Sequence, residues 1–287
     1  MLISRRPDHL QLITHGEHAR FAGVLCSHWG NERFGVPAPR DALLLAAAHH
    51  DDGWAELDGM PSWNPQAHRP AHFLELPLEV TVGPYGRGVD SVYGLDPLAG
   101  ALVSMHWAGL YSRRWGLQAG DPVELPLARQ VVAEQEPRWA AALRETWGYE
   151  GPRSEFEAGA WHAYEVLQAL DFISLALCLL DIGRSAGDGE ALPMPGTLWQ
   201  VDQPEGARIV PMVPEHEGGP YVDIRLWVDR PGRVCLDPYP FDPPEFELEL
   251  SAVVLEDRPF GAASEAAAAY RDSPRSVISV AIAALPG

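Results

Sequence analysis

The sequence predicts a mainly α-helical protein, in which a helical bundle is followed by a smaller β-rich C-terminal region. Apolar residues recur at helical spacing, between capping signals, through most of residues 14–182. Short runs rich in β-branched and aromatic residues, separated by Pro and Gly, follow after residue 196. We therefore expect a helical domain over residues 1–184, a linker rich in small residues over 185–195, and a β-rich region over 196–287.

Capping residues indicate where the first helices begin. Thr14-x-x-Glu17 is a capping-box pattern, and apolar residues follow it at helical spacing as far as Gly30. A second helix is expected over residues 39–49. Residues 58–95 contain many Pro and Gly and show little periodicity, so they are expected to form a long loop that includes short helical or extended pieces.

Three further helices are expected after residue 95. Asp96-Pro97 combines an N-cap with a proline at the first helical position, and predicts a helix that runs to residue 116. A helix over 127–147 has to accommodate Pro137, and the capping box Ser154-x-x-Glu157 opens a long apolar helix that ends near residue 183. The expected strands cover residues 197–201, 208–213, 221–228, 233–236 and 246–255.

Composition limits the classes of function. With 46% hydrophobic and 21% charged residues, the 287-residue chain is not a disordered, collagen-like or disulfide-stapled protein. Its formal net charge of −19 argues against binding to nucleic-acid polymers or to anionic membranes, whereas local positive charge can still hold a small anionic substrate. The three cysteines are far apart, the N-terminus lacks a signal-peptide pattern, and the longest apolar run is short. These features predict a cytoplasmic protein.

The densest group of chemically active side chains is the segment 49–54, with the sequence His-His-Asp-Asp-Gly-Trp. Imidazole and carboxylate groups together form a natural ligand set for a divalent transition metal. An adjacent His-Asp pair at a helix end can direct both groups at one centre, because the backbone is leaving helical geometry there. The alternative interpretation is a solvated, acidic helix C-terminus.

Three polar residues on apolar helix faces give this segment a context. His18, His106 and Asp171 each lie among aliphatic residues at helical spacing. A buried carboxylate is rarely stable unless it is paired, hydrogen-bonded or bound to a metal. Taken singly, the histidines are explained as satisfied core residues, and Asp171 by a bond to a backbone amide or an arginine. Together they form the ordered set His18, His50-Asp51, His106 and Asp171 on four separate helices.

This ordered set resembles the HD superfamily of metal-dependent phosphohydrolases, which is named for its His-Asp pair. The surrounding sequence is closer still to a bacterial branch of proteins of unknown function, and the similarity spans residues 10–182. The shared phrases are His18-Ala19, His50-Asp51-Asp52-Gly53-Trp54, Ser104-x-His106, and Leu170-Asp171-Phe172-Ile173-Ser174-Leu175 followed by Cys178. The resemblance implies a helical bundle of the HD type.

The resemblance also implies a bound divalent metal, which would be Mn, Fe, Co, Ni or Zn. The implied ligands are His18, His50, Asp51 and Asp171. His106 falls where members with two metals or six ligands carry additional histidines, so both one ion and two ions remain open. His68 and His72 are candidate ligands for a second ion, and His15 is the alternative to His18 on the first helix.

The function implied by this resemblance is hydrolysis of a small phosphorylated molecule: a phosphomonoester, a phosphodiester or a nucleotide. The metal would lower the pKa of a bound water and polarise a phosphoryl oxygen. Asp52 is a candidate base or orienting group, and His106 is a second catalytic candidate. Arginines pair with phosphate oxygens and tryptophan stacks on a base or sugar. The candidate substrate contacts are Arg87, Arg113, Arg114 and Trp54.

Two other functions are compatible with the same residues. A di-iron oxygenase-like enzyme would use the same helices with two irons. A non-enzymatic ligand-binding or interaction protein would use the polar cluster for structure alone. In the β-rich region, Tyr239-Pro240-Phe241 is interpreted as a packing segment or a dimer contact, so a homodimer is a candidate assembly.

Overall fold

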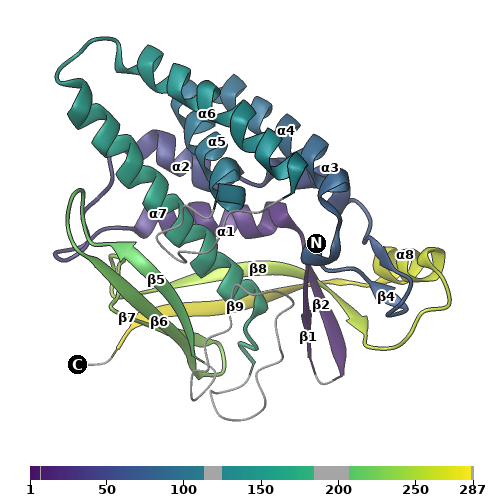
Figure 1. Cartoon of the computed structure of the whole chain (residues 1–287). Helices are drawn as coiled ribbons and strands as arrows, with labels where there is room; N and C mark the ends of the chain where they lie inside the picture. The colour runs from purple at the N-terminus through teal and green to yellow at the C-terminus, as the bar shows by residue number, and fades with distance from the viewer. Residues whose placement is uncertain (7, 113–124, 184–206, 286–287) are drawn as a thin grey trace.

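The computed structural model describes residues 1–6, 8–112, 125–183 and 207–285. The larger helices form a layer on one face of a curled, seven-stranded mixed sheet (Figure 1). About 51% of the described residues are helical, but the sheet is too large for a helical bundle with a small β region. The mainly α fold class expected from the sequence is therefore wrong.

The strand order in the large sheet is β1-β2-β8-β9-β7-β6-β5. The bounds are Leu2–Arg5 (β1), His9–Ile13 (β2), Arg208–Pro214 (β5), Tyr221–Arg230 (β6), Arg233–Asp237 (β7), Glu245–Glu256 (β8) and Arg275–Ala284 (β9). Neighbouring strands are antiparallel, except for the parallel pair β7 and β9. A separate short pair consists of β3 (Trp63–Asn64) and β4 (Arg69–Pro70).

The N-terminal hairpin is one reason why the sheet is larger than expected. Residues 2–13 fall within the helical domain expected from the sequence, whereas they form β1 and β2. Each strand is too short for its periodicity to distinguish strand from helix. β2 pairs with β8, with Leu10 opposite Leu255, so the first 13 residues extend a sheet built from residues after 207. The expected linker at 185–195 and the expected strand at 197–201 lie outside the described residues.

The end of the chain supplies the other unexpected elements. The expected strands from residue 208 to 255 are present as β5 to β8, but β9 and the preceding helix α8 (Ala263–Asp272) were not expected. β9 pairs with β8 on one side and with β7 on the other. It therefore occupies the middle of the sheet, and without it the strands would fall into two separate groups.

The helices begin close to the expected caps, with one exception. Their bounds are His15–His28 (α1), Arg40–His49 (α2), Ala55–Asp58 (α3), Leu78–Leu95 (α4), Pro97–Ser112 (α5), Pro126–Trp147 (α6) and Arg153–Leu179 (α7), with short 3₁₀ turns at Asp52–Trp54 (η1) and Phe73–Glu75 (η2). The Thr14 hydroxyl accepts from the Glu17 amide, as the capping box predicts. The second predicted box is wrong, because Ser154 lies inside α7 and Pro152 precedes the helix.

Helix α4 occupies half of the segment that was expected to be a loop. Four glycines and Pro84 hide its periodicity in the sequence. Two glycines explain its position. A Cβ atom on Gly88 would collide with the backbone nitrogen of Gly53, and one on Gly53 would lie 2.7 Å from the Cα atom of Tyr85. Glycine at both positions therefore lets α4 pack directly against the turn that follows His50 and Asp51.

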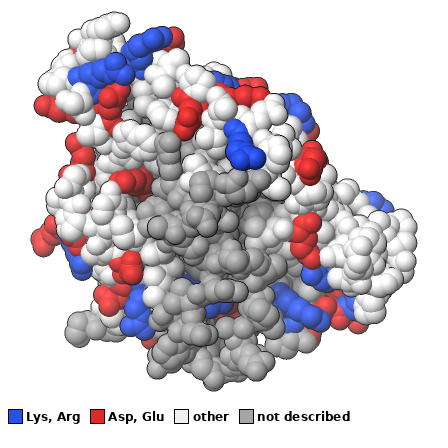
Figure 2. All heavy atoms as spheres, in the orientation of Figure 1, with Lys and Arg blue, Asp and Glu red and all other residues white. Residues whose placement is uncertain are grey.

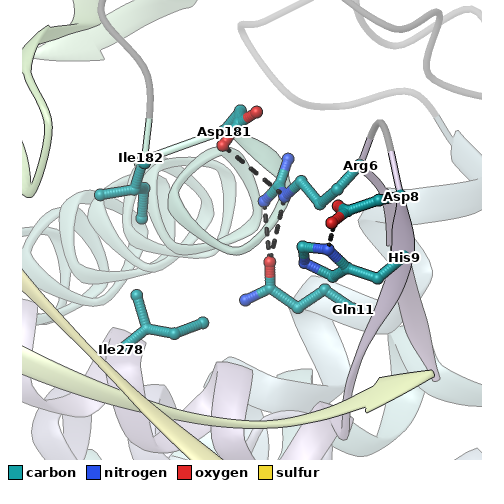
Figure 3. A pocket seen from close by; sticks show the side chains of 8 residues that line it. Arg6, Asp8, His9, Gln11, Asp181, Ile182 and Ile278 are labelled. Carbon is teal, nitrogen blue, oxygen red and sulfur yellow. Dashed lines mark hydrogen bonds and ion pairs between the residues drawn. The ribbon is translucent and has the colours of Figure 1, made fainter. Parts of the chain in front are cut away.

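Helix α7 runs through the centre of the molecule. It is long and apolar enough to cross a membrane by length and composition, but 83% of its most apolar window is buried inside the protein. Its C-terminal end is held by Arg6, whose Nη2 donates to the Leu180 carbonyl at 2.6 Å and to Gln11 Oε1 at 2.9 Å. Figure 3 shows these side chains around a pocket between the β1–β2 hairpin and the end of α7.

The described surface mixes the two signs of charge. On the face shown in Figure 2, carboxylate and guanidinium side chains are interspersed over the helical layer. The net charge of −19 is therefore not gathered into one continuous acidic patch on the described part of this face.

Candidate metal centre

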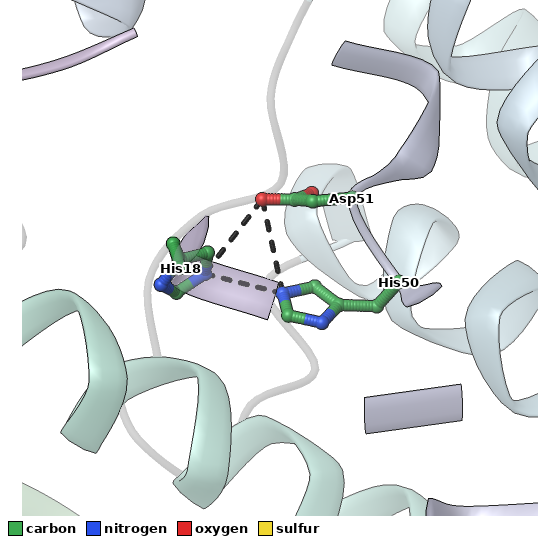
Figure 4. Close-up of side chains that lie close together, drawn as sticks. All are labelled: His18, His50 and Asp51. Carbon is green, nitrogen blue, oxygen red and sulfur yellow. Dashed lines mark hydrogen bonds and ion pairs between the residues drawn. The ribbon is translucent and has the colours of Figure 1, made fainter. Parts of the chain in front are cut away.

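Three helices bring four buried donors together beneath the helical layer. His18 lies on α1, His50 and Asp51 lie at the end of α2, and Asp171 lies on α7. The φ of Asp51 is −112°, so the chain leaves helical geometry directly after His50 and both side chains turn inward. Figure 4 shows His18, His50 and Asp51 pointing toward one another.

The donor atoms converge on a small space. His18 Nε2 lies 2.9 Å and His50 Nε2 lies 3.3 Å from Asp171 Oδ1, and the two nitrogens are 3.2 Å apart. Asp51 Oδ2 is 3.7 Å from His18 Nε2 and 3.8 Å from His50 Nε2. Atoms bound to one ion at ~2.1 Å are roughly 3.0–3.4 Å apart in octahedral or tetrahedral coordination. His18, His50 and Asp171 are therefore spaced as ligands of a single ion, and the Asp51 oxygen lies a few tenths of an ångström farther out.

Hydrogen bonding orients both imidazoles with Nε2 toward this space. His50 Nδ1 can only donate to the Ala47 carbonyl, at 2.9 Å. The Ser174 hydroxyl donates to the Asp171 carbonyl, at 2.9 Å, so His18 Nδ1 donates to Ser174 Oγ, at 3.0 Å. In neutral histidines, both Nε2 atoms are then acceptors that face a carboxylate oxygen. Such a group of acceptors needs a cation, either a proton or a metal ion, and the donors present fit a divalent metal.

The electrostatics of the group agree with this requirement. Burial alone would lower the pKa of His50, but the carboxylates of Asp51 and Asp171 outweigh it and raise the pKa to about 9. Burial alone would raise the pKa of Asp171, but hydrogen bonds with His18 and His50 hold it well below its ordinary value. In the absence of a metal ion, a protonated imidazole therefore balances the negative charge of the two carboxylates.

His106 lies at the edge of the group, on α5. Its Nε2 is 4.0 Å from Asp171 Oδ2, and its ring centroid is 5.3 Å from that of His50. Burial is the main reason why its pKa falls to about 4, so the imidazole is neutral at pH 7. The described residues contain two sets of three donors, and within each set the donor atoms lie within 4.8 Å of one another. The first set is His18, His50 and Asp51, and the second is His50, His106 and Asp171. They share His50, whose Nδ1 is already bonded, so its single free nitrogen can serve one ion only.

Except for His106, the candidate catalytic and substrate-binding residues lie apart from this group or outside the described residues. Asp52 contacts His49 Nδ1 at 2.9 Å, and both side chains are half-buried. Arg87 forms a two-pronged ion pair with the exposed Glu56. Trp54 is buried and stacks on His15, with ring centroids 4.0 Å apart. Arg113 and Arg114 lie outside the described residues.

The alternative histidines have other surroundings. His15 Nδ1 lies 3.1 Å from both carboxylate oxygens of Asp58. His72 is buried and caps η2, where its Nδ1 accepts from the Leu74 amide. His68 has a positive φ of 51°, and its carbonyl accepts from Phe260. None of the three belongs to either donor set among the described residues.

Two residues at the centre were not singled out from the sequence. Ser174 follows Asp171 by three positions, so the spacing on one helical face could have indicated that it supports the same site. Tyr85 belongs to α4, which was expected to be a loop, so its periodicity gave no signal. Its buried hydroxyl has no hydrogen-bond partner among the described residues.

Comparison with protein families identifies relatives of the chain. Residues 1–257 match the DUF3891 family, whose description is a protein of unknown function. The chain belongs to the DUF3891 family. The DUF3891 match includes all four donors of the centre and every strand of the large sheet except β9. No curated protein and no solved structure matches the chain, so the DUF3891 relationship comes without a known activity.

Proposed function

We propose that this DUF3891 protein is a metal-dependent hydrolase of a small phosphorylated molecule. The ligands of the divalent cation would be His18, His50, Asp51 and Asp171. The observation that carries the proposal is the fixed orientation of His18 and His50, whose Nε2 atoms both face the same oxygen of Asp171. The order of these residues also resembles that of the HD superfamily.

The side chains around the centre would orient the metal ligands and transfer protons. When bound, the metal would supply a low-pKa water and a positive charge for a phosphoryl oxygen. Ser174 and the Ala47 carbonyl fix the two imidazoles and thereby keep their Nε2 lone pairs available. His106 is neutral and lies next to Asp171, so we assign to it the proton transfer. A catalytic role for Asp52, which contacts His49, stays a prediction.

The charge of the centre suits an anionic substrate once the cation is present. The carboxylates of Asp51 and Asp171 carry two negative charges, which a divalent ion would cancel. The chain contains no lysine, and all 21 of its basic residues are arginines. Arg87 is already paired with Glu56, so its role as a substrate contact would require that exposed ion pair to open.

One observation favours a mononuclear hydrolase over the di-iron alternative. Both described donor sets use His50, and only the Nε2 atom of this residue is free to bind an ion. A second ion would therefore need ligands beyond His106 and a shared Asp171. The non-enzymatic alternative is tested by the same measurement of metal content, because it needs no ion.

The proposal is tested by elemental analysis and phosphate release on three proteins: wild type, His50→Ala and His49→Ala. His49 is the matched control, since it precedes His50 but contacts only Asp52. We expect about one divalent ion per chain in wild type and His49→Ala, and release of phosphate from a phosphoester panel in wild type. His50→Ala should lose both while its circular dichroism remains that of a folded protein. A wild-type protein that takes up no metal, or equal metal content in His50→Ala, would contradict the proposal.

A further inference from the structure

Tyr85 lies against the turn that carries His50 and Asp51. Its Cα atom is packed on Gly53, two residues after Asp51, because neither Gly53 nor Gly88 has a side chain to separate α4 from the turn. Its ring stacks on that of Trp107, next to His106 on α5, with centroids 5.1 Å apart. It also meets Trp54 edge-on at 6.3 Å. The side chain is therefore held rigidly between two elements that supply the centre.

The hydroxyl of Tyr85 is buried without a hydrogen-bond partner among the described residues. The whole residue is only 5% exposed. Burial, then the negative charges of Asp51 and Asp171, and a hydrogen-bonding interaction of the phenol with the Asp51 carboxylate raise the pKa of Tyr85 well above its ordinary value. Its electrostatic neighbours are therefore two of the four candidate metal ligands. What distinguishes this buried donor is its place beside the acceptors of the candidate centre, where a bound anion can accept from it.

We propose that the Tyr85 hydroxyl contacts the substrate and donates a hydrogen bond to a phosphoryl oxygen of the molecule held at the metal centre. This inference rests on the proposed function and identifies an uncharged contact for the anionic group. A phenol suits the task, since it donates without adding a formal charge and its ring is already immobilised by Trp107. Hydrogen bonds from fixed donors to anionic oxygens are stronger than those between neutral groups.

A second tyrosine on the same helix provides a matched control. The Tyr93 hydroxyl is also buried without a partner among the described residues. The charged neighbours of Tyr93 are Arg138, which lies 4.8 Å from its ring centroid, and Asp90. Tyr93→Phe and Tyr85→Phe therefore remove the same group from the same helix, but only Tyr85→Phe removes it from the candidate centre.

The test is the binding of inorganic phosphate to Mn²⁺-loaded protein, measured by isothermal titration calorimetry, with metal content and melting temperature recorded for each protein. We expect Tyr85→Phe to keep its metal and its melting temperature but to bind phosphate about tenfold more weakly than wild type. Tyr93→Phe should bind phosphate as wild type does. Phosphate should also perturb the near-ultraviolet tyrosine absorption of wild type and Tyr93→Phe, which tests the contact without requiring the Tyr85 variant.

The possible outcomes separate the two proposals. Equal phosphate affinity in wild type and Tyr85→Phe, or equal weakening in Tyr93→Phe, would overturn the role of Tyr85 while the metal centre stands. Failure of metal-loaded wild type to bind phosphate would also overturn the proposed role of Tyr85. Failure of wild type to bind metal would instead remove the proposed function, and the Tyr85 contact with it.

Discussion

His18 Nε2 and Asp171 Oδ1 lie 2.9 Å apart although 153 residues separate them in the chain. The contact joins α1 to the middle of α7, and both side chains are buried. Ser174, on the next turn of α7, holds the other nitrogen of the same imidazole. One helix thus supplies both a carboxylate for the centre and the group that orients its partner histidine.

Replacement of Ser174 by alanine should weaken metal binding without unfolding the protein. The variant removes the acceptor for His18 Nδ1, so the imidazole can rotate or change tautomer. Loss of such supporting hydrogen bonds typically reduces metal affinity about 10- to 100-fold. Metal titration of Ser174→Ala measures the effect. Ser104→Ala is the control, because Ser104 is equally buried but donates to Gln135. Equal affinity in Ser174→Ala and wild type would exclude this orienting role.

Metal binding should release a proton and should strengthen as pH rises. The pKa of His50 is raised to about 9 in the absence of metal, so at pH 7 the imidazole carries a proton that a metal has to displace. The apparent dissociation constant should therefore fall about tenfold per pH unit between pH 6 and the pKa. Calorimetry in buffers of different ionisation enthalpy counts the protons released. A metal affinity that does not change over this pH range would show that metal binding displaces no proton from His50.

Substitution of Gly88 should disturb the centre from outside it. A Cβ atom at this position would collide with the backbone of Gly53, so Gly88→Ala should push α4 away from the His-Asp turn. We expect a loss of about 1–3 kcal/mol in the free energy of unfolding, together with weaker metal binding. Gly94→Ala on the same helix meets nothing within 4 Å and should gain up to about 1 kcal/mol. Denaturant unfolding measures the free energy of unfolding of both variants. The prediction is wrong if Gly88→Ala is as stable as Gly94→Ala.

His72 should make the protein less stable in mild acid. Burial is the main reason why its pKa falls from 6.5 to about 3 in the folded state. As pH falls below 6.5, the unfolded chain takes up a proton that the folded chain refuses. The contribution of His72 is therefore complete above pH 6.5 and is lost progressively as pH falls toward 3. His72→Asn can still cap η2 but does not titrate, so its unfolding free energy should depend less on pH between 6.5 and 3. The same dependence of unfolding free energy on pH in wild type and His72→Asn would contradict this prediction.

The convergence of the four donors could be anticipated from sequence, because His18 and Asp171 interrupt apolar helix faces and the His50-Asp51 pair stands where a helix ends. His18 and Asp171 lie on faces that have to be buried, and a His-Asp pair at a helix end turns inward with them. The order of the residues then indicated a common centre. The number of ions could not be anticipated, because it depends on His50, whose Nδ1 is bonded to the Ala47 carbonyl.

The large sheet and Tyr85 were missed for physical reasons. The β1 and β2 strands are short, and β2 pairs with β8, which is more than 230 residues away, so local pattern carries no information on this pairing. Helix α4 contains glycines that serve close packing against Gly53, and the same glycines remove the apolar period that identifies a helix. Tyr85 is therefore recognisable only once α4 has been placed.

The central claim, that His18, His50, Asp51 and Asp171 hold one cation, is tested most directly by X-ray absorption spectroscopy of the Zn²⁺-loaded protein. We expect a single zinc environment with two imidazole ligands and oxygen donors in wild type, and no bound zinc in His50→Ala. A zinc spectrum without imidazole ligands, or one unchanged in His50→Ala, would contradict it.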